Sequence, residues 1–139
     1  MERNFIDGYT EWQTNPEIVA VNKLPQHATL MPYENFDEAK KADRYASTRC
    51  KLLNGKWKFK LYKNYAYRPS DFAQPHYDSH NWDSVIVPCS WQMQGYDQAQ
   101  YCNVRYPWEG SEDICPPNAP TKHNPVGCYL KRIHINEAV

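Results

Sequence analysis

Three kinds of side chain in this sequence could carry out catalysis or bind a metal: sixteen carboxylates, five histidines and five cysteines. Two carboxylates held close together could serve as a general acid and a general base. Asp78 and Asp83 flank Trp82, but acidic residues around a tryptophan in a loop usually cap turns or face water. The spacing of the other acidic residues selects no pair, so the carboxylates alone predict no catalytic site.

Ser90, His123 and Asp97 are the residue types of a catalytic triad, and His76 and His80 could form a metal-binding pair. The triad lacks the G-x-S-x-G sequence that would present the serine on a sharp turn. Two histidines four residues apart can bind a metal when they lie on a helix. The segment around them contains Pro and Asp and is predicted to be a loop. We therefore discount the triad and interpret both histidines as surface residues.

Four of the five cysteines recur at intervals of thirteen residues. A zinc site usually needs two cysteines separated by about two to four residues, and no such pair occurs. The cysteines are Cys50, Cys89, Cys102, Cys115 and Cys128. Their odd number, together with a charged first segment (MERNFIDGYTEW) that lacks an apolar stretch, is typical of a cytoplasmic protein with reduced thiols. We expect no zinc site and no signal peptide.

The charges are balanced, with sixteen basic and sixteen acidic residues. Proteins that bind nucleic acid normally carry a basic excess, so we expect no nucleic acid partner. No stretch approaches the ~18 consecutive apolar residues that indicate a membrane span, so we expect no membrane partner. Aromatic residues make up 14% of the chain and prolines number eleven. This composition favours a rigid, mainly β protein with long ordered loops.

Two segments precede the predicted strands. Residues 1–33 show no sustained hydrophobic period and contain three prolines, which predicts an extended N-terminal arm without a core of its own. Such an arm must lie on something larger to be ordered. Residues 34–45 form the one predicted helix, because apolar residues recur there at helical intervals and Asn35 or Asp37 could cap it.

Strands follow in the rest of the chain. In LNGKWKFKLY, Trp57, Phe59 and Leu61 alternate with lysines, which predicts one buried and one solvated face, after a tight turn at Asn54-Gly55. Residues 85–87 form a short strand that Pro88 ends. CYLKRIHI is the last strand, with three apolar residues on one side: Tyr129, Ile133 and Ile135.

These three or four strands fall short of the roughly eight that a jelly-roll β-sandwich needs. The last strand is followed directly by NEAV, with no further element. We therefore expect two parts: the arm at residues 1–33, and the first part of a jelly-roll domain, incomplete at its C-terminal side, at residues 34–139.

One irregular segment, VPCSWQMQGYDQAQYCNVRYPW at residues 87–108, gathers Trp, Tyr, Pro and Gly. Stiff loops of this kind form binding pockets and partner contacts. Together with PPNAP and NPVGCYLKRIHI, the segment closely resembles the N-terminal domain of bacterial β-galactosidases of glycoside hydrolase family 2. WQTNPEIVAVNKLPQHA, LNGKWKF and DFAQPHYDSHNWDSVIVP are similar to the same domain. The resemblance covers residues 12–135.

The resemblance implies a much longer enzyme that hydrolyses terminal β-D-galactose residues of lactose-type substrates. Enzymes of this family begin with a jelly-roll domain similar to galactose-binding domains, and they hold their active site in a TIM barrel. Their two catalytic glutamates and the ligands of Mg²⁺, with Na⁺ as a second candidate ion, lie in that barrel and hence outside this chain. The resemblance therefore implies that the chain alone is inactive and that the complete protein is a homo-oligomer.

The resemblance also implies that one piece of the substrate site lies in this chain. YCNV matches a loop that reaches the mouth of the barrel in the family, which assigns substrate contact to Asn103 and, beside it, Val104. An amide suits this role because it can donate to and accept from a sugar hydroxyl. The spacing alone would instead favour a turn role for Asn103. Cys102 stands where the family has Thr, and Gln98-Ala99 where it usually has a Pro-containing pair.

Two alternatives stay open. One is another specificity within family 2, such as β-glucuronidase or β-mannosidase, which share the jelly roll but lack the block at residues 91–108. The other is a non-catalytic carbohydrate-binding module, or a subunit that docks onto a partner carrying the rest of the enzyme. Open strand edges argue against a module that folds alone.

Overall fold

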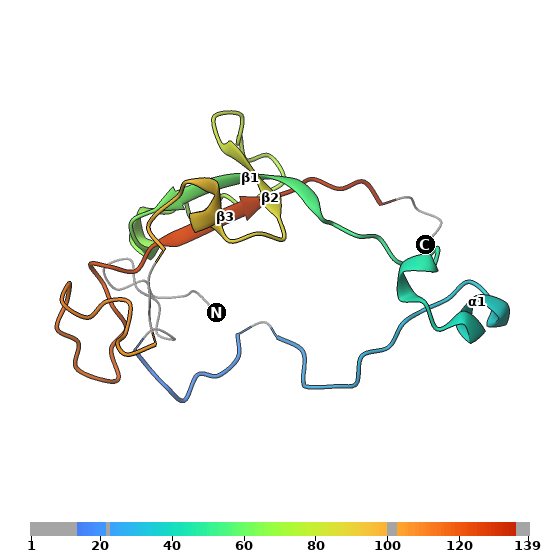
Figure 1. Cartoon of the computed structure of the whole chain (residues 1–139), viewed down its shortest axis with the longest axis horizontal. Helices are drawn as coiled ribbons and strands as arrows, with labels where there is room; N and C mark the ends of the chain where they lie inside the picture. Colours follow the sequence, from blue (N-terminus) through green and yellow to red (C-terminus); the bar gives the residue numbers. More distant parts are fainter. Residues whose placement is uncertain (1–13, 22, 100–102, 136–139) are drawn as a thin grey trace.

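The computed structural model describes residues 14–21, 23–99 and 103–135 (Figure 1). Its centre is a three-stranded antiparallel sheet of β1 (Gly55–Tyr62), β2 (Asp83–Val87) and β3 (Val126–Leu130). β1 lies in the middle, between β2 and β3. The predicted mainly β fold is confirmed, and the sheet is consistent with part of a β-sandwich.

The alternating pattern of β1 explains its central place. Phe59 lies opposite Asp83 of β2 and Tyr129 of β3, and it is fully buried, whereas Lys56 is exposed. The Phe59 ring contacts the rings of Tyr129 and Tyr96, with centroid distances of 4.8 and 4.7 Å. Such aromatic pairs stabilise a core beyond the area that they bury. The core is therefore built on the apolar face of β1.

The buried core of the described residues is small. Its apolar members are Phe59, Trp82, Val85 and Cys128. Trp82 closes the loop between β1 and β2, where its ring lies 6.1 Å from that of Phe72 and 5.5 Å from that of Tyr77. Near Asp71 the chain makes a turn, in which the Asp71 carbonyl accepts the Gln74 N–H at 2.8 Å. This loop is thus packed on its own aromatic cluster.

The predicted helix over residues 34–45 is present but shorter than expected. Helix α1 spans Phe36–Lys41 and is capped by the Asn35 side chain, one of the two predicted caps. Ala42 ends it in a left-handed conformation with φ of 53°. Asp43 then caps a separate 3-10 turn, η2 (Arg44–Ala46), by accepting a backbone N–H. A side chain that bonds its own backbone in this way competes with continuation of the helix.

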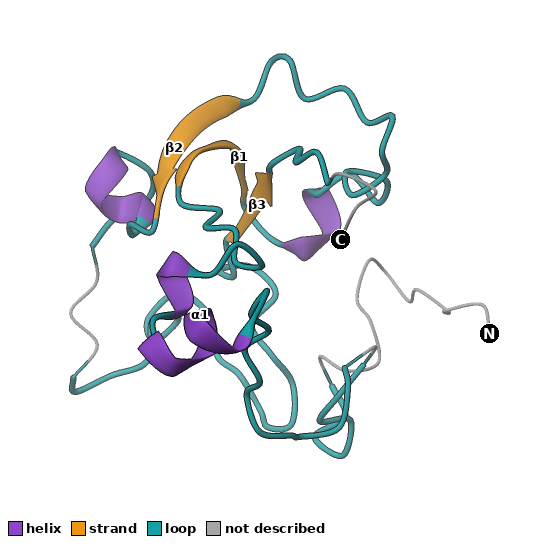
Figure 2. Cartoon of the chain, turned by 90° about the vertical axis from the view of Figure 1, so that its right-hand side faces the viewer, coloured by secondary structure: helices purple, strands orange, loops and turns teal. Residues whose placement is uncertain are grey.

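No residue of α1 is buried, and both views show it apart from the sheet (Figure 2). The apolar residues of this helix are therefore not buried against the sheet. No helix within the described residues is long and apolar enough to span a bilayer.

The described part of the predicted arm, residues 14–33 without 22, contains no helix or strand. It follows a path of its own, apart from the sheet (blue in Figure 1). Val19, Leu24 and Leu30 are exposed by 86%, 77% and 86%. The boundary between arm and domain at residue 33 stays a prediction.

Two predicted boundaries were wrong. Asn54-Gly55 forms no tight turn: the Asn54 carbonyl accepts from Lys131 Nζ at 3.0 Å, and Gly55, with φ of 104°, already pairs with Val87. The last strand begins two residues earlier than CYLKRIHI and ends at Leu130. Ile133 and Ile135, predicted to lie on one side of the strand with Tyr129, follow the strand and are exposed.

Candidate functional site

The stiff segment at residues 87–108 leaves the sheet at the end of β2 and is tied back to that strand. After the cis peptide between Val87 and Pro88, the 3-10 helix η4 spans Trp91–Gln94. The Gln94 side chain accepts the Ile86 N–H at 2.6 Å and donates to the Ile86 carbonyl at 3.1 Å. This paired bond occupies outer backbone groups of β2 and fixes where the loop begins.

Trp91 and Tyr96 anchor the same segment on the core. The Trp91 ring packs over Gly127 of β3 so closely that a Cβ there would lie 2.5 Å from the indole. It also lies 6.0 Å from the ring of Phe59, which Tyr96 meets edge to face. Burial raises the pKa of Tyr96, and its hydrogen bond to Asp83 adds to the shift. Both aromatic residues therefore act as scaffold.

Asn103 and Val104 lie on an exposed bend of this loop, and Val104 is 81% exposed. Neither is buried in the core, so both are accessible to a partner molecule. Their roles in substrate binding stay predictions. Tyr101 and Cys102, which the sequence placed beside them, lie outside the described residues.

Beyond Asn103, Tyr106 and Trp108 stack on each other with a centroid distance of 4.8 Å and an interplanar angle of 7°. The Tyr106 N–H donates to Glu109 Oε2 at 3.2 Å. The N–H groups of Ser111 and Glu112 both donate to the Trp108 carbonyl, at 2.9 and 3.1 Å. The aromatic pair therefore sits on a closed turn.

Glu112 joins this turn to the segment that leads into β3. Its carboxylate accepts the Thr121 hydroxyl at 2.6 Å and the backbone N–H groups of Thr121, Lys122 and His123 at 2.9, 2.7 and 3.4 Å. The Thr121 hydroxyl bond and these backbone bonds lower the pKa of Glu112 to about 2. No sequence pattern indicated this residue, because most of its partners are backbone groups.

The discounted triad is not assembled. Asp97 and His123 line the same cavity, but the Ser90 hydroxyl donates to the Gln92 side chain. Asp97 adopts a left-handed conformation with φ of 58°, which Asp tolerates better than most residues. Ser90 therefore lacks the hydrogen bond to a base that would activate it.

The other candidate groups show local contacts only. Asp78 accepts the His80 N–H at 2.9 Å and contacts His80 Nδ1 at 2.8 Å, and these bonds lower the pKa of Asp78. A carboxyl with a lowered pKa is a poor general acid. Among the described residues, no three His, Cys, Asp or Glu side chains gather in a way that could hold a metal. The four described cysteines are free thiols: Cys50, Cys89, Cys115 and Cys128.

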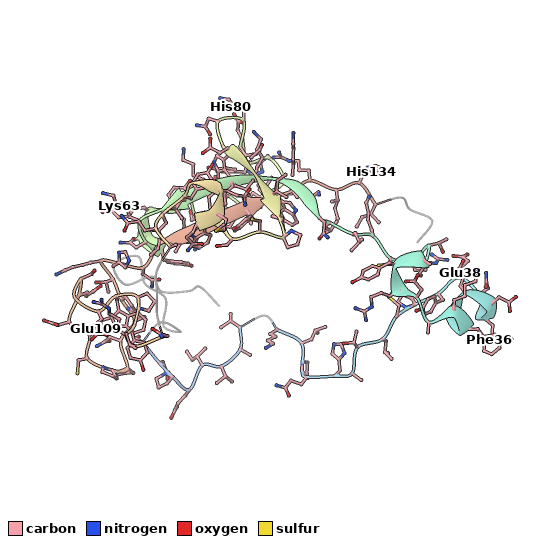
Figure 3. The ribbon with its side chains drawn as sticks, viewed as in Figure 1. Phe36, Glu38, Lys63, His80, Glu109 and His134 are labelled. Atoms are coloured by element: carbon pink, nitrogen blue, oxygen red, sulfur yellow. The ribbon has the colours of Figure 1, made fainter. Side chains whose placement is uncertain are left out.

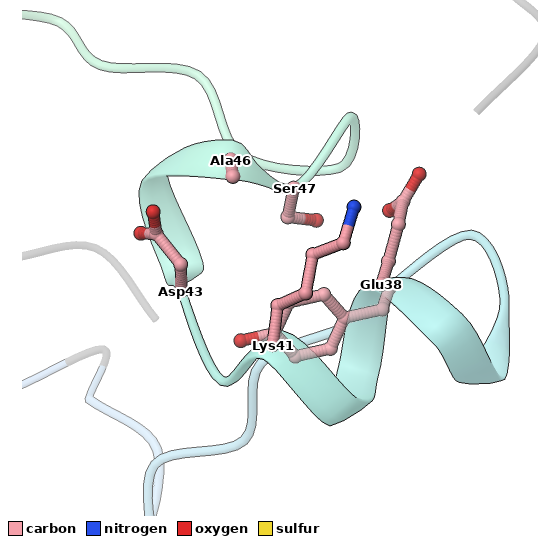
Figure 4. Close-up of a pocket in the computed structure, with 6 residues that line it drawn as sticks. Glu38, Lys41, Asp43, Ala46 and Ser47 are labelled. Carbon is pink, nitrogen blue, oxygen red and sulfur yellow. The ribbon is translucent and has the colours of Figure 1, made fainter.

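A small pocket beside α1 is lined by Tyr33, Glu38, Lys41 and Ser47 among others (Figure 4). Its volume of about 20 Å³ has room for one water molecule and not for a substrate. We therefore place the candidate site in the loop between β2 and β3.

Comparison with known proteins identifies the family. Residues 50–139, which contain the whole sheet and this loop, match the family model described as "Glycosyl hydrolases family 2, sugar binding domain". The chain belongs to glycosyl hydrolase family 2. The match begins before β1 and continues beyond β3, so the three strands and the loop with Asn103 all lie within the sugar-binding domain of that family.

Similar curated proteins cover almost the whole chain. It is 48% identical over 125 residues to a beta-galactosidase of Priestia megaterium, and 40% identical over 124 residues to one of Halalkalibacterium halodurans. A third relative, the "Beta-galactosidase large subunit" of Lactobacillus helveticus, is 39% identical over 140 aligned positions. These alignments cover 90%, 89% and 92% of the chain but only 12%, 12% and 22% of the relatives. The chain thus spans a small part of the length of the proteins that it matches.

Proposed function

We propose that this chain is the N-terminal part of a β-galactosidase that hydrolyses terminal non-reducing β-D-galactose residues of lactose-type substrates. The observation that carries the proposal is the high identity to proteins named beta-galactosidase over about nine tenths of the chain. The family match to a sugar-binding domain supports the same class of reaction.

Within that enzyme, the chain supplies substrate contacts and not the reacting groups. Retaining glycosidases need two carboxyl groups about 5 Å apart on either side of the bond that they cleave. We assign that pair of glutamates to the TIM barrel in the rest of the polypeptide. Asn103 would bind a hydroxyl of the galactosyl group, with Val104 beside it, and the exposure of this bend supports the assignment.

The ion that we propose for the complete enzyme, Mg²⁺ with Na⁺ as a second candidate, also belongs to the rest of the polypeptide. The described residues gather no set of three or more ligating side chains that fits it. When bound, the ion would stabilise developing negative charge or position a water molecule. This chain's own contribution is to hold the loop with Asn103 in place.

The partners that we propose are the barrel domain and, in the complete protein, further copies of the subunit. The exposed apolar side chains of the arm support this, because an isolated arm gains nothing by presenting Val19, Leu24 and Leu30 to water. We place the enzyme in the cytoplasm, where the free thiols at Cys89 and Cys115 would stay reduced.

A substrate panel tests this function and its main alternative. The full-length polypeptide should hydrolyse a chromogenic β-D-galactoside with a kcat/KM at least a hundredfold above that for the matching β-D-glucuronide and β-D-mannoside. A preference for the glucuronide or the mannoside would assign another family 2 specificity. Hydrolysis of none of the three would favour a non-catalytic sugar-binding or subunit-docking role.

A further inference from the structure

The loop between β2 and β3 encloses a groove with a volume of about 360 Å³. Trp91, Trp108, Asp97, His123 and Asn124 are among its lining residues. A second hollow of about 320 Å³ shares Asp97 and His123 with it, so the two adjoin. Both volumes fall within the range of about 300 to 1,000 Å³ that is typical of small-molecule sites. Asn103 and Val104 do not line either hollow.

The walls of this groove are held in place by contacts within the chain. Trp91 is locked against Gly127 and Phe59 of the sheet. Trp108 is fixed by the two backbone N–H groups that donate to its carbonyl, and one of these belongs to Glu112. The Glu112 carboxylate in turn binds the His123 N–H, so the Trp108 and His123 walls are tied through one residue. A site that is formed before the ligand arrives loses less entropy on binding.

The side chains of the groove combine flat apolar surface with hydrogen-bonding groups. Two indole rings offer faces on which the C–H face of a sugar ring could pack, as aromatic rings with a polar edge commonly do in mixed sites. Asp97 accepts, and His123 and Asn124 both donate and accept, which matches the hydroxyl groups of a sugar.

The charge of the groove restricts the class of ligand. Asp97 is the one acidic residue that lines the main groove and neither Lys nor Arg lines it, whereas Lys63 and Lys122 line the adjoining hollow. A carboxylate or phosphate in the main groove would therefore meet the charge of Asp97 and no Lys or Arg among the lining residues. We propose that this groove is an accessory site for a neutral pyranoside, separate from the Asn103 bend. The proposal needs no hydrolysis and does not depend on the identity of the substrate of the complete enzyme.

The test is an NMR titration of the 139-residue chain, labelled with ¹⁵N at its tryptophan indoles, with methyl β-D-galactopyranoside. We expect the Trp91 and Trp108 signals to shift saturably. The Trp57 signal should stay in place, because its indole N–H already donates to the Leu53 carbonyl at 2.7 Å, away from the groove. Absence of a saturable shift at Trp91 and Trp108 would overturn the proposal, as would an equal shift at Trp57.

Variants and a second ligand locate the site. Trp108→Ala should weaken binding at least tenfold and Trp108→Phe, which keeps a ring, by less. Phe36→Ala is the control, because Phe36 is another exposed aromatic residue at the opposite end of the molecule from Glu109 of the groove loop (Figure 3). Methyl β-D-glucuronide should bind at least tenfold more weakly than the neutral glycoside. Asp97→Asn should reduce this difference in affinity between the two glycosides. Equal binding by wild type and Trp108→Ala would contradict the assignment.

Discussion

At the residue scale, Glu112 shows how one side chain can order a long loop. Its carboxylate gathers the N–H groups of three consecutive residues, which would otherwise need water or other partners. Because hydrogen bonds to the ionised form lower its pKa to about 2, the carboxylate stays charged through the ordinary pH range. These hydrogen bonds therefore hold the loop in place at neutral pH and are lost only in acid.

Acid should remove the stabilisation that Glu112 provides. Since the pKa is lower in the folded state, the unfolded state binds more protons, so this contribution is present above about pH 4.5 and falls as the pH drops towards about 2. Glu112→Gln should lower the thermal midpoint at pH 7. It should also make the midpoint fall less steeply as the pH drops between those values. Differential scanning calorimetry measures both effects. Asp113→Asn, at the exposed neighbouring carboxylate, is the control, and identical acid profiles for wild type and Glu112→Gln would contradict the account.

Asn103 is the second residue whose role can be measured directly. In the full-length polypeptide, Asn103→Ala should lower kcat/KM for a β-galactoside by about three- to tenfold, which corresponds to one net hydrogen bond of about 0.5–1.5 kcal/mol. Asn118→Ala removes an amide from the same loop that donates to the Cys115 carbonyl, and it should leave kcat/KM unchanged. An equal effect of the two substitutions would assign Asn103 a structural role.

At the element scale, the sheet positions the loop through one close contact, the approach of Trp91 to Gly127. β1 was predictable because Trp57, Phe59 and Leu61 alternate with lysines, and β2 because Pro88 ends an apolar run. The end of α1 at Ala42 was not, because it depends on Asp43 capping a new turn. The close approach at Gly127 depends on residues 36 positions apart in sequence (127 − 91), so spacing could not reveal it.

Gly127→Ala should therefore destabilise the fold. The added Cβ would lie 2.5 Å from Trp91 and 2.8 Å from the Phe59 ring, and overpacking of this kind costs about 1–3 kcal/mol. Urea denaturation measures the change in the free energy of unfolding. In a Trp91→Leu background, Gly127→Ala should lower the free energy of unfolding by less, because the closer of the two clashes is removed. Equal costs in both backgrounds would show that Trp91 does not press on Gly127.

At the scale of the whole molecule, much of the apolar surface of the described residues lies outside the small core. The apolar side chains of the arm are exposed, α1 buries none of its residues, and β2 and β3 are the two outer strands of the described sheet. The chain spans 12% of the length of two bacterial relatives, and in the proposed enzyme the rest of the polypeptide would cover such surfaces. The family could be inferred from the sequence blocks, whereas the groove and the hydrogen bonds of Glu112 could be found only in the structure.

The central claim is that this chain contributes to a β-galactosidase without carrying its reacting groups. The most direct test is to assay the purified 139-residue chain and the full-length polypeptide side by side, at equal molar concentration, with a chromogenic β-D-galactoside. We predict hydrolysis by the full-length polypeptide and none above the buffer rate by the chain alone. Hydrolysis by the chain alone would contradict the claim, because it would require a catalytic pair within these residues.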